Sequence, residues 1–116
     1  MSKSWYGFDL DGTLAYYPPS VGYIGEPIFK MVEKLKEHLR SGDSIRIVTA
    51  RVCSMYPERD KQANRSRIDA WCIFYFGQTF PITAEKDYDM VRLYDERAVE
   101  IVHNLGITRS EYDQQR

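Results

Sequence analysis

The sequence predicts an α/β fold in which strands and helices alternate around a parallel sheet. Apolar segments typical of strands alternate with segments of helical periodicity along the 116 residues, and glycines and polar residues separate them. Carboxylates follow two of the expected strands directly, at the edge where open α/β sheets bind ligands. Because domains most often contain about 100–150 residues, the chain is expected to be a single domain, 1–116.

The first expected strand, 4–10, carries a near-continuous apolar run, as a strand buried on both faces does. The loop after it, 12–25, is long for a connection, and loops of this length often act as flaps or lids. The first helix is expected to open at Glu26 and Pro27, since proline suits the first helical turn. Gly42 is expected to end this helix.

The second half repeats the alternation, which gives the order β-α-β-α-β-β-α. A strand is expected at 44–49, and a polar connection, 51–64, leads into a helix at 60–76. Two shorter strands are expected at 80–83 and 90–94.

A third helix is expected at 95–105, because four apolar residues recur there at helical spacing. These residues are Ala98, Val99, Val102 and Leu105. The polar tail, 107–116, is expected to be frayed.

Composition excludes several classes of protein. The apolar fraction is 43%, too high for a disordered chain, and no apolar run approaches the roughly 18 residues that span a bilayer. The net charge of −1 does not favour nucleic acid as a partner. The two cysteines lack metal-ligand spacing and are expected to be reduced. No leader is visible before the first strand, so a cytoplasmic location is expected.

The chemistry of the chain is expected to centre on Asp9 and Asp11, which the turn residue Gly12 follows. Residues two apart in an extended chain point to the same side. Two neighbouring carboxylates repel one another unless a cation or a shared proton lies between them. The pair therefore suggests a Mg²⁺ site that performs chemistry on a phosphate.

Other polar residues follow the strands that would neighbour this pair. Thr49 ends the second strand, and Asp95 and Glu96 end the fourth. Thr49 is expected to donate a hydrogen bond to a phosphoryl oxygen, and Asp95 to be a third carboxylate of the metal site. Lys86, just before the fourth strand, is expected to place a positive charge on the phosphate or on the nucleophile.

These motifs resemble those of the haloacid dehalogenase superfamily, specifically its phosphatases with no cap or a minimal one. The D-x-D-G-T motif is matched by Asp9, Asp11, Gly12 and Thr13, and the other three motifs by Thr49, Lys86 and the pair Asp95-Glu96. The resemblance covers about residues 4–106. It implies a three-layer Rossmann-like fold with about four parallel strands in the order 3-2-1-4 and no large cap domain.

The resemblance also implies roles for these residues. Asp9 would be the nucleophile that forms an aspartyl-phosphate, as well as a metal ligand, and Asp11 the general acid and base whose backbone carbonyl binds the metal. Thr49 and Lys86 would hold the phosphoryl group, and Asp95 would complete the Mg²⁺ site. Glu96 stands where the family often has a second Asp, and it is expected to reach a metal-bound water.

Thr49-Ala50-Arg51, with the arginines and the tryptophan-bearing helix that follow, resembles the phosphatase part of polynucleotide kinase-phosphatases. We therefore expect Thr49, Ala50, Arg51 and Lys86 to bind the substrate, which would be a phosphorylated small molecule, such as a nucleotide, or a phosphorylated nucleic-acid end. A site with no cap would equally admit a sugar phosphate or a phosphoprotein.

Three alternatives stay open. The alternative to a phosphatase is a non-catalytic phosphate- or metal-binding module, either receiver-like or with a vestigial site. The basic stretch 51–67 is either a solvated helix face or a surface that grips nucleic acid. Likewise, Tyr16, Tyr17 and Tyr23 in the loop 12–25 either stack on a base or pack the loop onto the domain.

Overall fold

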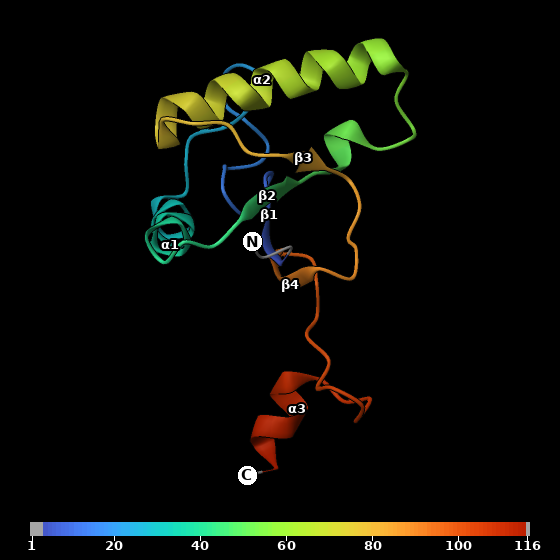
Figure 1. Cartoon of the computed structure of the whole chain (residues 1–116). Coiled ribbons are helices and arrows are strands. Elements are labelled where there is room, and N and C mark those ends of the chain that lie inside the picture. The colour runs from blue at the N-terminus through green and yellow to red at the C-terminus, as the bar shows by residue number, and fades with distance from the viewer. Residues whose placement is uncertain (1–3, 116) are drawn as a thin grey trace.

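A computed structural model describes residues 4–115 and contains a four-stranded parallel sheet in the order β3-β2-β1-β4 (Figure 1). The central strand β1 (Trp5–Asp9) pairs with β2 (Ile45–Val48) on one side and with β4 (Met90–Tyr94) on the other. Strand β3 (Ile82–Thr83) pairs with β2 at one edge. The α/β fold and the strand order predicted from the sequence are confirmed. Residues 1–3 and 116 of the predicted domain lie outside the described residues.

Two long helices pack on one face of this sheet. Helix α1 (Phe29–Arg40) connects β1 to β2, and α2 (Glu58–Phe76) connects β2 to β3 after a 3₁₀ turn, η1 (Ala50–Val52). Both crossovers step along the sheet in the same direction. Since such crossovers are right-handed, they place both helices on the same face.

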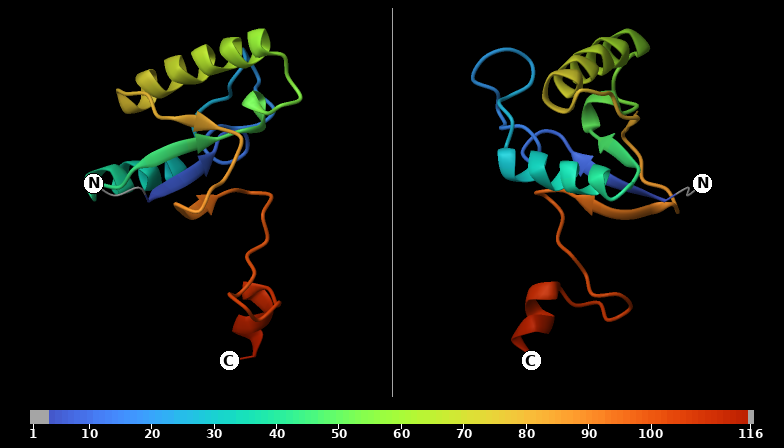
Figure 2. Two further views of the ribbon diagram at one scale, coloured as in Figure 1. Left: turned by 45° about the vertical axis from the view of Figure 1, so that its right-hand side comes forward. Right: turned by 60° about the vertical axis from the view of Figure 1, so that its left-hand side comes forward.

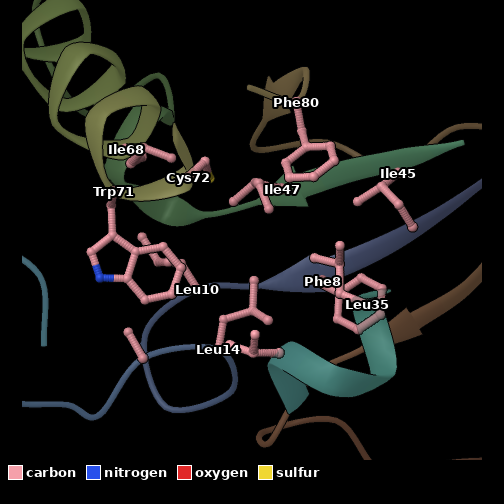
Figure 3. Packing of buried hydrophobic residues seen from close by; sticks show 12 residues of the cluster. Phe8, Leu10, Leu14, Leu35, Ile45, Ile47, Ile68, Trp71, Cys72 and Phe80 are labelled. Atoms are coloured by element: carbon pink, nitrogen blue, oxygen red, sulfur yellow. The ribbon is translucent and has the colours of Figure 1, made fainter. Parts of the chain in front are cut away.

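The core lies between these helices and the sheet (Figure 3). The buried cluster consists of Phe8, Leu10, Leu14, Ala15, Val32, Leu35, Ile45, Ile47, Ile68, Trp71, Cys72 and Phe80. Trp71 also donates a 3.1 Å hydrogen bond from its indole N–H to the backbone carbonyl of Gly25. This bond attaches the end of the loop 12–25 to α2.

The second face of the sheet is covered by a side-chain stack. The Trp5 ring lies beside Gly7, where an added Cβ would come within 2.9 Å of it. The Arg46 guanidinium lies 4.5 Å from the centre of the Trp5 ring. Asp87 accepts a 2.8 Å hydrogen bond from the Trp5 indole and pairs with Arg46. Trp5 is consequently only 1% exposed.

We call residues 12–25 the flap. An antiparallel bridge brings the two ends of the flap together. Ala15 pairs with Pro27, and the Ile28 amide donates a 2.7 Å hydrogen bond to the Leu14 carbonyl. Because this pairing holds the chain extended through Ile28, α1 begins at Phe29 and not at Glu26 and Pro27 as predicted. Between its paired ends the flap arches away from the sheet (Figure 2).

The prediction of a helix at 95–105 is wrong. The chain forms an antiparallel turn there, in which the Val102 amide donates to the Ile107 carbonyl at 2.9 Å and the Arg109 amide to the Glu100 carbonyl at 3.0 Å. Asn104 and Gly106 turn the chain with positive φ angles, which a continuous helix excludes.

The last helix, α3 (Arg109–Gln114), lies in the tail that was expected to be frayed. The Thr108 hydroxyl caps this helix by accepting a 3.0 Å hydrogen bond from the Glu111 amide. The views agree that α3 stands apart from the sheet (Figures 1 and 2). None of the helices within residues 4–115 combines the length and the apolar character needed to cross a bilayer.

Candidate functional site

The turn after β1 sets the direction of the candidate site. The Leu10 carbonyl accepts hydrogen bonds from the amides of Thr13, Leu14 and Ala15, at 3.3, 3.0 and 2.9 Å. Gly12 makes this tight turn possible, because its φ of 87° is one that other residues rarely adopt. Asp9 and Asp11 are therefore held at the carboxyl end of β1, the edge predicted for ligand binding.

Three carboxylates meet at this edge, which we call the acid cluster: Asp9, Asp95 and Glu96. One oxygen from each residue lies within 4.8 Å of the others. Asp9 ends β1, whereas Asp95 and Glu96 directly follow β4, the neighbouring strand. The Thr13 hydroxyl fixes this approach, since it accepts a 3.2 Å hydrogen bond from the Glu96 amide across the two strand ends.

The cluster disfavours the ionised form of Asp9. Burial, then the charge of Asp95 and the hydrogen bond and charge of Glu96, raise the pKa of Asp9 from 3.8 to about 7. Each of these causes penalises one more negative charge at the site. A bound cation would remove this penalty, and oxygen atoms of carboxylates are the ligands that Mg²⁺ prefers. The donor set therefore fits a hard divalent cation.

Asp11 has a different environment from Asp9. Its two carboxylate oxygens each accept a 2.8 Å hydrogen bond from Arg51, one from Nε and one from Nη2. The same Nη2 donates a 2.7 Å hydrogen bond to the Tyr23 carbonyl of the flap. The hydrogen bond to Asp11, and then the charge of Asp11, raise the pKa of Arg51 above its usual range. Arg51 thus connects the turn after β1 to the flap.

Thr49 lies where the sequence predicts it, directly after β2, and is 3% exposed. Its hydroxyl oxygen accepts a 3.2 Å hydrogen bond from the Arg51 amide and so caps η1. Ala50 is exposed as the first residue of η1. The Arg51 carbonyl accepts a 2.7 Å hydrogen bond from Asn64, which attaches η1 to α2.

Lys86 makes no hydrogen bond or ion pair with the other predicted site residues within residues 4–115. It is exposed in the loop between β3 and β4 and makes no hydrogen bond or ion pair with the described residues. Its neighbour Asp87 is held by Trp5 and Arg46 on the second face of the sheet.

The structure thus gathers Asp9, Asp95 and Glu96 in one cluster and pairs Asp11 with Arg51, while the Lys86 amine stays in solvent. Two contributions were missed by the reasoning from sequence, whereas Glu96, expected to reach a metal-bound water, does lie beside Asp9 and Asp95. The Thr13 hydroxyl was readable from its place in the motif. The Tyr23 carbonyl left no signal, because any residue supplies a backbone oxygen.

Comparisons of the sequence with protein-family models, curated proteins and solved structures found no match.

Proposed function

We propose that this chain is a Mg²⁺-dependent phosphomonoesterase of the haloacid dehalogenase type, with Asp9 as its nucleophile. The observation that carries the proposal is the acid cluster, in which carboxylates at the ends of β1 and β4 meet at one sheet edge. Burial, and then the neighbouring acids, raise the pKa of Asp9 there to about 7. A carboxylate at such a site is suited to nucleophilic catalysis once the surrounding negative charge is neutralised.

Asp9 and Asp95, with the Asp11 backbone carbonyl, would hold Mg²⁺, and Glu96 lies close enough to contribute as well. When bound, Mg²⁺ supplies the positive charge that lets a carboxylate approach a phosphate dianion.

The proposed reaction has two steps. In the first, an Asp9 carboxylate oxygen forms a bond to phosphorus while the ester P–O bond breaks, and Asp11 gives a proton to the leaving oxygen. In the second, water attacks the phosphorus of the aspartyl-phosphate. Asp11 takes a proton from that water, and inorganic phosphate leaves as the Asp9 carboxylate is restored.

The acid role of Asp11 requires a change at Arg51. In the structure both Asp11 oxygens accept hydrogen bonds from Arg51, so neither oxygen is available to pass a proton to a leaving group. The planar guanidinium also suits bidentate binding of phosphate. We therefore propose that Arg51 leaves Asp11 for the incoming phosphoryl group, where Thr49 donates a hydroxyl hydrogen bond.

The proposal is tested by hydrolysis of p-nitrophenyl phosphate with Mg²⁺ and then with excess EDTA. We expect turnover that EDTA abolishes and that Asp9→Asn lowers by at least about 1,000-fold, since the attacking group is lost. Asp60→Asn is the matched control, because Asp60 lies in the first turn of α2, outside the acid cluster. Near-normal turnover by Asp9→Asn contradicts the assignment of the nucleophile.

The alternative, a non-catalytic phosphate- or metal-binding module, draws support from two observations. Lys86 makes no hydrogen bond or ion pair with the described residues, and both carboxylate oxygens of Asp11 accept hydrogen bonds from Arg51. Such a module binds Mg²⁺ or phosphate without hydrolysing p-nitrophenyl phosphate. Mg²⁺ binding by calorimetry, combined with the absence of turnover, identifies this alternative.

A further inference from the structure

A groove lies between the flap and α2, next to the candidate site. Its volume is about 410 Å³, and it is shallow and largely open to solvent. The flap contributes Tyr23 and Ile24, and α2 contributes Arg67, Ala70, Trp71, Phe74 and Tyr75. Small-molecule sites commonly have volumes of about 300–1,000 Å³. The groove is therefore large enough for a ring system of a small ligand.

The lining of the groove is aromatic and exposed. The Phe74 side chain is 81% exposed and Tyr23 is 63% exposed. Exposed apolar rings that gather in one concave place are typical of ligand-binding surfaces. Their faces suit a planar ring, because stacking on an aromatic side chain needs no particular hydrogen-bond pattern.

A single cation lines this groove. The Arg67 guanidinium lies 3.6 Å from the centre of the Tyr23 ring, a cation–π contact that holds the ring against α2. Arg67 also donates a 3.2 Å hydrogen bond to Asn64. A ligand in the groove thus meets aromatic surface together with positive charge, which favours a planar ligand that carries an anionic group.

One guanidinium group connects a residue of the groove to the candidate site. Arg51 Nη2 donates to the Tyr23 carbonyl at 2.7 Å and to Asp11 Oδ1 at 2.8 Å. The flap residue that lines the groove and the carboxylate proposed as acid and base are thus bridged by one nitrogen atom. Tyr23 is therefore held next to Asp11, so that the groove and the candidate site share a neighbouring residue.

We propose that this groove binds the base of a phosphorylated nucleoside whose phosphoryl group is at Asp9, an inference that rests on the proposed function. The base stacks on the exposed ring of Phe74, while the Tyr23 ring is held by its contact with Arg67. This ligand combines the two properties that the groove and its surroundings select: a planar ring, and an anionic phosphate on the side of Arg51.

The test compares adenosine 5′-monophosphate with ribose 5-phosphate, which carries the same phosphate and sugar but no base. We expect the wild-type protein to have the lower KM for the nucleotide. Phe74→Ala should reduce the ratio of the two KM values about tenfold, as the loss of one stacking contact does. Ile73→Ala is the matched control, since Ile73 is a 54% exposed neighbour on α2 that does not line the groove.

Equal KM values for the two substrates, or a ratio that Phe74→Ala leaves unchanged, would overturn the proposal while leaving phosphatase activity intact. If the protein hydrolyses neither substrate, calorimetry with the two compounds replaces the kinetic measurement. Tighter binding of the nucleotide that depends on Phe74 then supports the groove although the proposed reaction has failed. Equal binding of both compounds removes the groove proposal as well.

A third substrate, a 5′-phosphorylated oligonucleotide, distinguishes the two sources of such a base. A lower KM for the oligonucleotide than for the mononucleotide, again dependent on Phe74, identifies a nucleic-acid end as the ligand. A lower KM for the mononucleotide identifies the free nucleotide. If Phe74→Ala alters only the oligomeric state, measured by sedimentation, the groove is a contact between copies of the chain and the proposal is wrong.

Discussion

Arg51 holds both carboxylate oxygens of Asp11 at 2.8 Å, although the two residues are 40 positions apart in the chain. Asp9 pairs with no cation among residues 4–115 and lies instead beside the acids that follow β4. Two carboxylates of one motif thus occupy opposite electrostatic environments. Separate environments of this kind allow two acids to perform different tasks at the same pH.

The first prediction concerns the contact of Arg51 with the flap. Arg51→Ala removes the hydrogen bond to the Tyr23 carbonyl as well as the pair with Asp11. Hydrogen bonds to charged groups contribute about 1.5–3 kcal/mol, so the flap should open at least about tenfold more often. Limited proteolysis should cleave the variant within residues 16–25 at least about tenfold faster.

Arg59→Ala is the control for this experiment. The Arg59 side chain is 90% exposed, and its nearest carboxylate oxygen, on Asp60, is 3.7 Å away. An exposed pair of this kind contributes little, so cleavage of the flap should keep its wild-type rate. Equal cleavage of Arg51→Ala and the wild-type protein would show that Arg51 does not restrain the flap.

The sequence was sufficient to predict the sheet, because each strand is marked by its own residues. The apolar run of β1 ends at Asp9, and the strand order 3-2-1-4 was correct. The sequence was not sufficient to predict the structure of residues 95–105, because apolar residues at helical spacing belong there to an antiparallel turn. Asn104 adopts a φ of 63°. This conformation depends on the hydrogen bonds of the whole turn and not on Asn104 alone.

The candidate site, too, could be predicted from the sequence only in part. The residues at the ends of β1 and β4 are neighbours because the strands pair, so their meeting was predictable from topology. The pairing of Asp11 with Arg51 was not, since it depends on the conformation of η1 and the flap. Lys86 was placed by its distance from β4 in the sequence, and the loop between β3 and β4 leaves its amine exposed.

The second prediction concerns the space around Gly12. A Cβ at this position would lie 2.9 Å from Cγ and Cδ of Glu96, in a backbone conformation with φ at 87°. Gly12→Ala should therefore destabilise the protein by about 1–2 kcal/mol, mainly through backbone strain and to a smaller extent by displacing the flexible Glu96 side chain. Denaturant unfolding measures this change in the free energy of unfolding.

Two further variants separate the causes. Gly42 has a φ of 83° with no neighbouring atom within 4 Å, so Gly42→Ala should cost only about 1 kcal/mol. In a Glu96→Ala background, Gly12→Ala should lose the overpacking and retain the backbone strain. The expectation fails if Gly12→Ala costs the same with and without the Glu96 side chain.

The third prediction concerns the two thiols. Cys72 is 1% exposed in the core, and burial, followed by the charge of Asp69, raises its pKa to about 12. Because the thiolate is the reactive form, Cys72 should react with a thiol reagent only when the protein unfolds. Cys53 is half-buried and should react first. Rapid modification of two thiols per chain in native buffer would contradict the burial of Cys72.

The last prediction concerns pH and the acid cluster. The pKa of Asp9 is raised to about 7 in the folded protein, against 3.8 for an ordinary aspartate. Between these two values the folded state holds a proton on Asp9 that the unfolded state has released. Stability then falls as pH rises. In metal-free buffer the contribution of Asp9 should therefore lower Tm progressively from about pH 4 to pH 7.

Asp9→Asn isolates this contribution, because the amide does not titrate. The difference in Tm between Asp9→Asn and the wild-type protein should grow from pH 4 to pH 7 and then level off. Mg²⁺ should raise the Tm of the wild-type protein at pH 8, above the pKa of Asp9, and should have less effect on Asp9→Asn. A difference in Tm that stays constant across this range would mean that Asp9 titrates as it does in the unfolded chain. The repulsion within the acid cluster would then be too weak to select a cation.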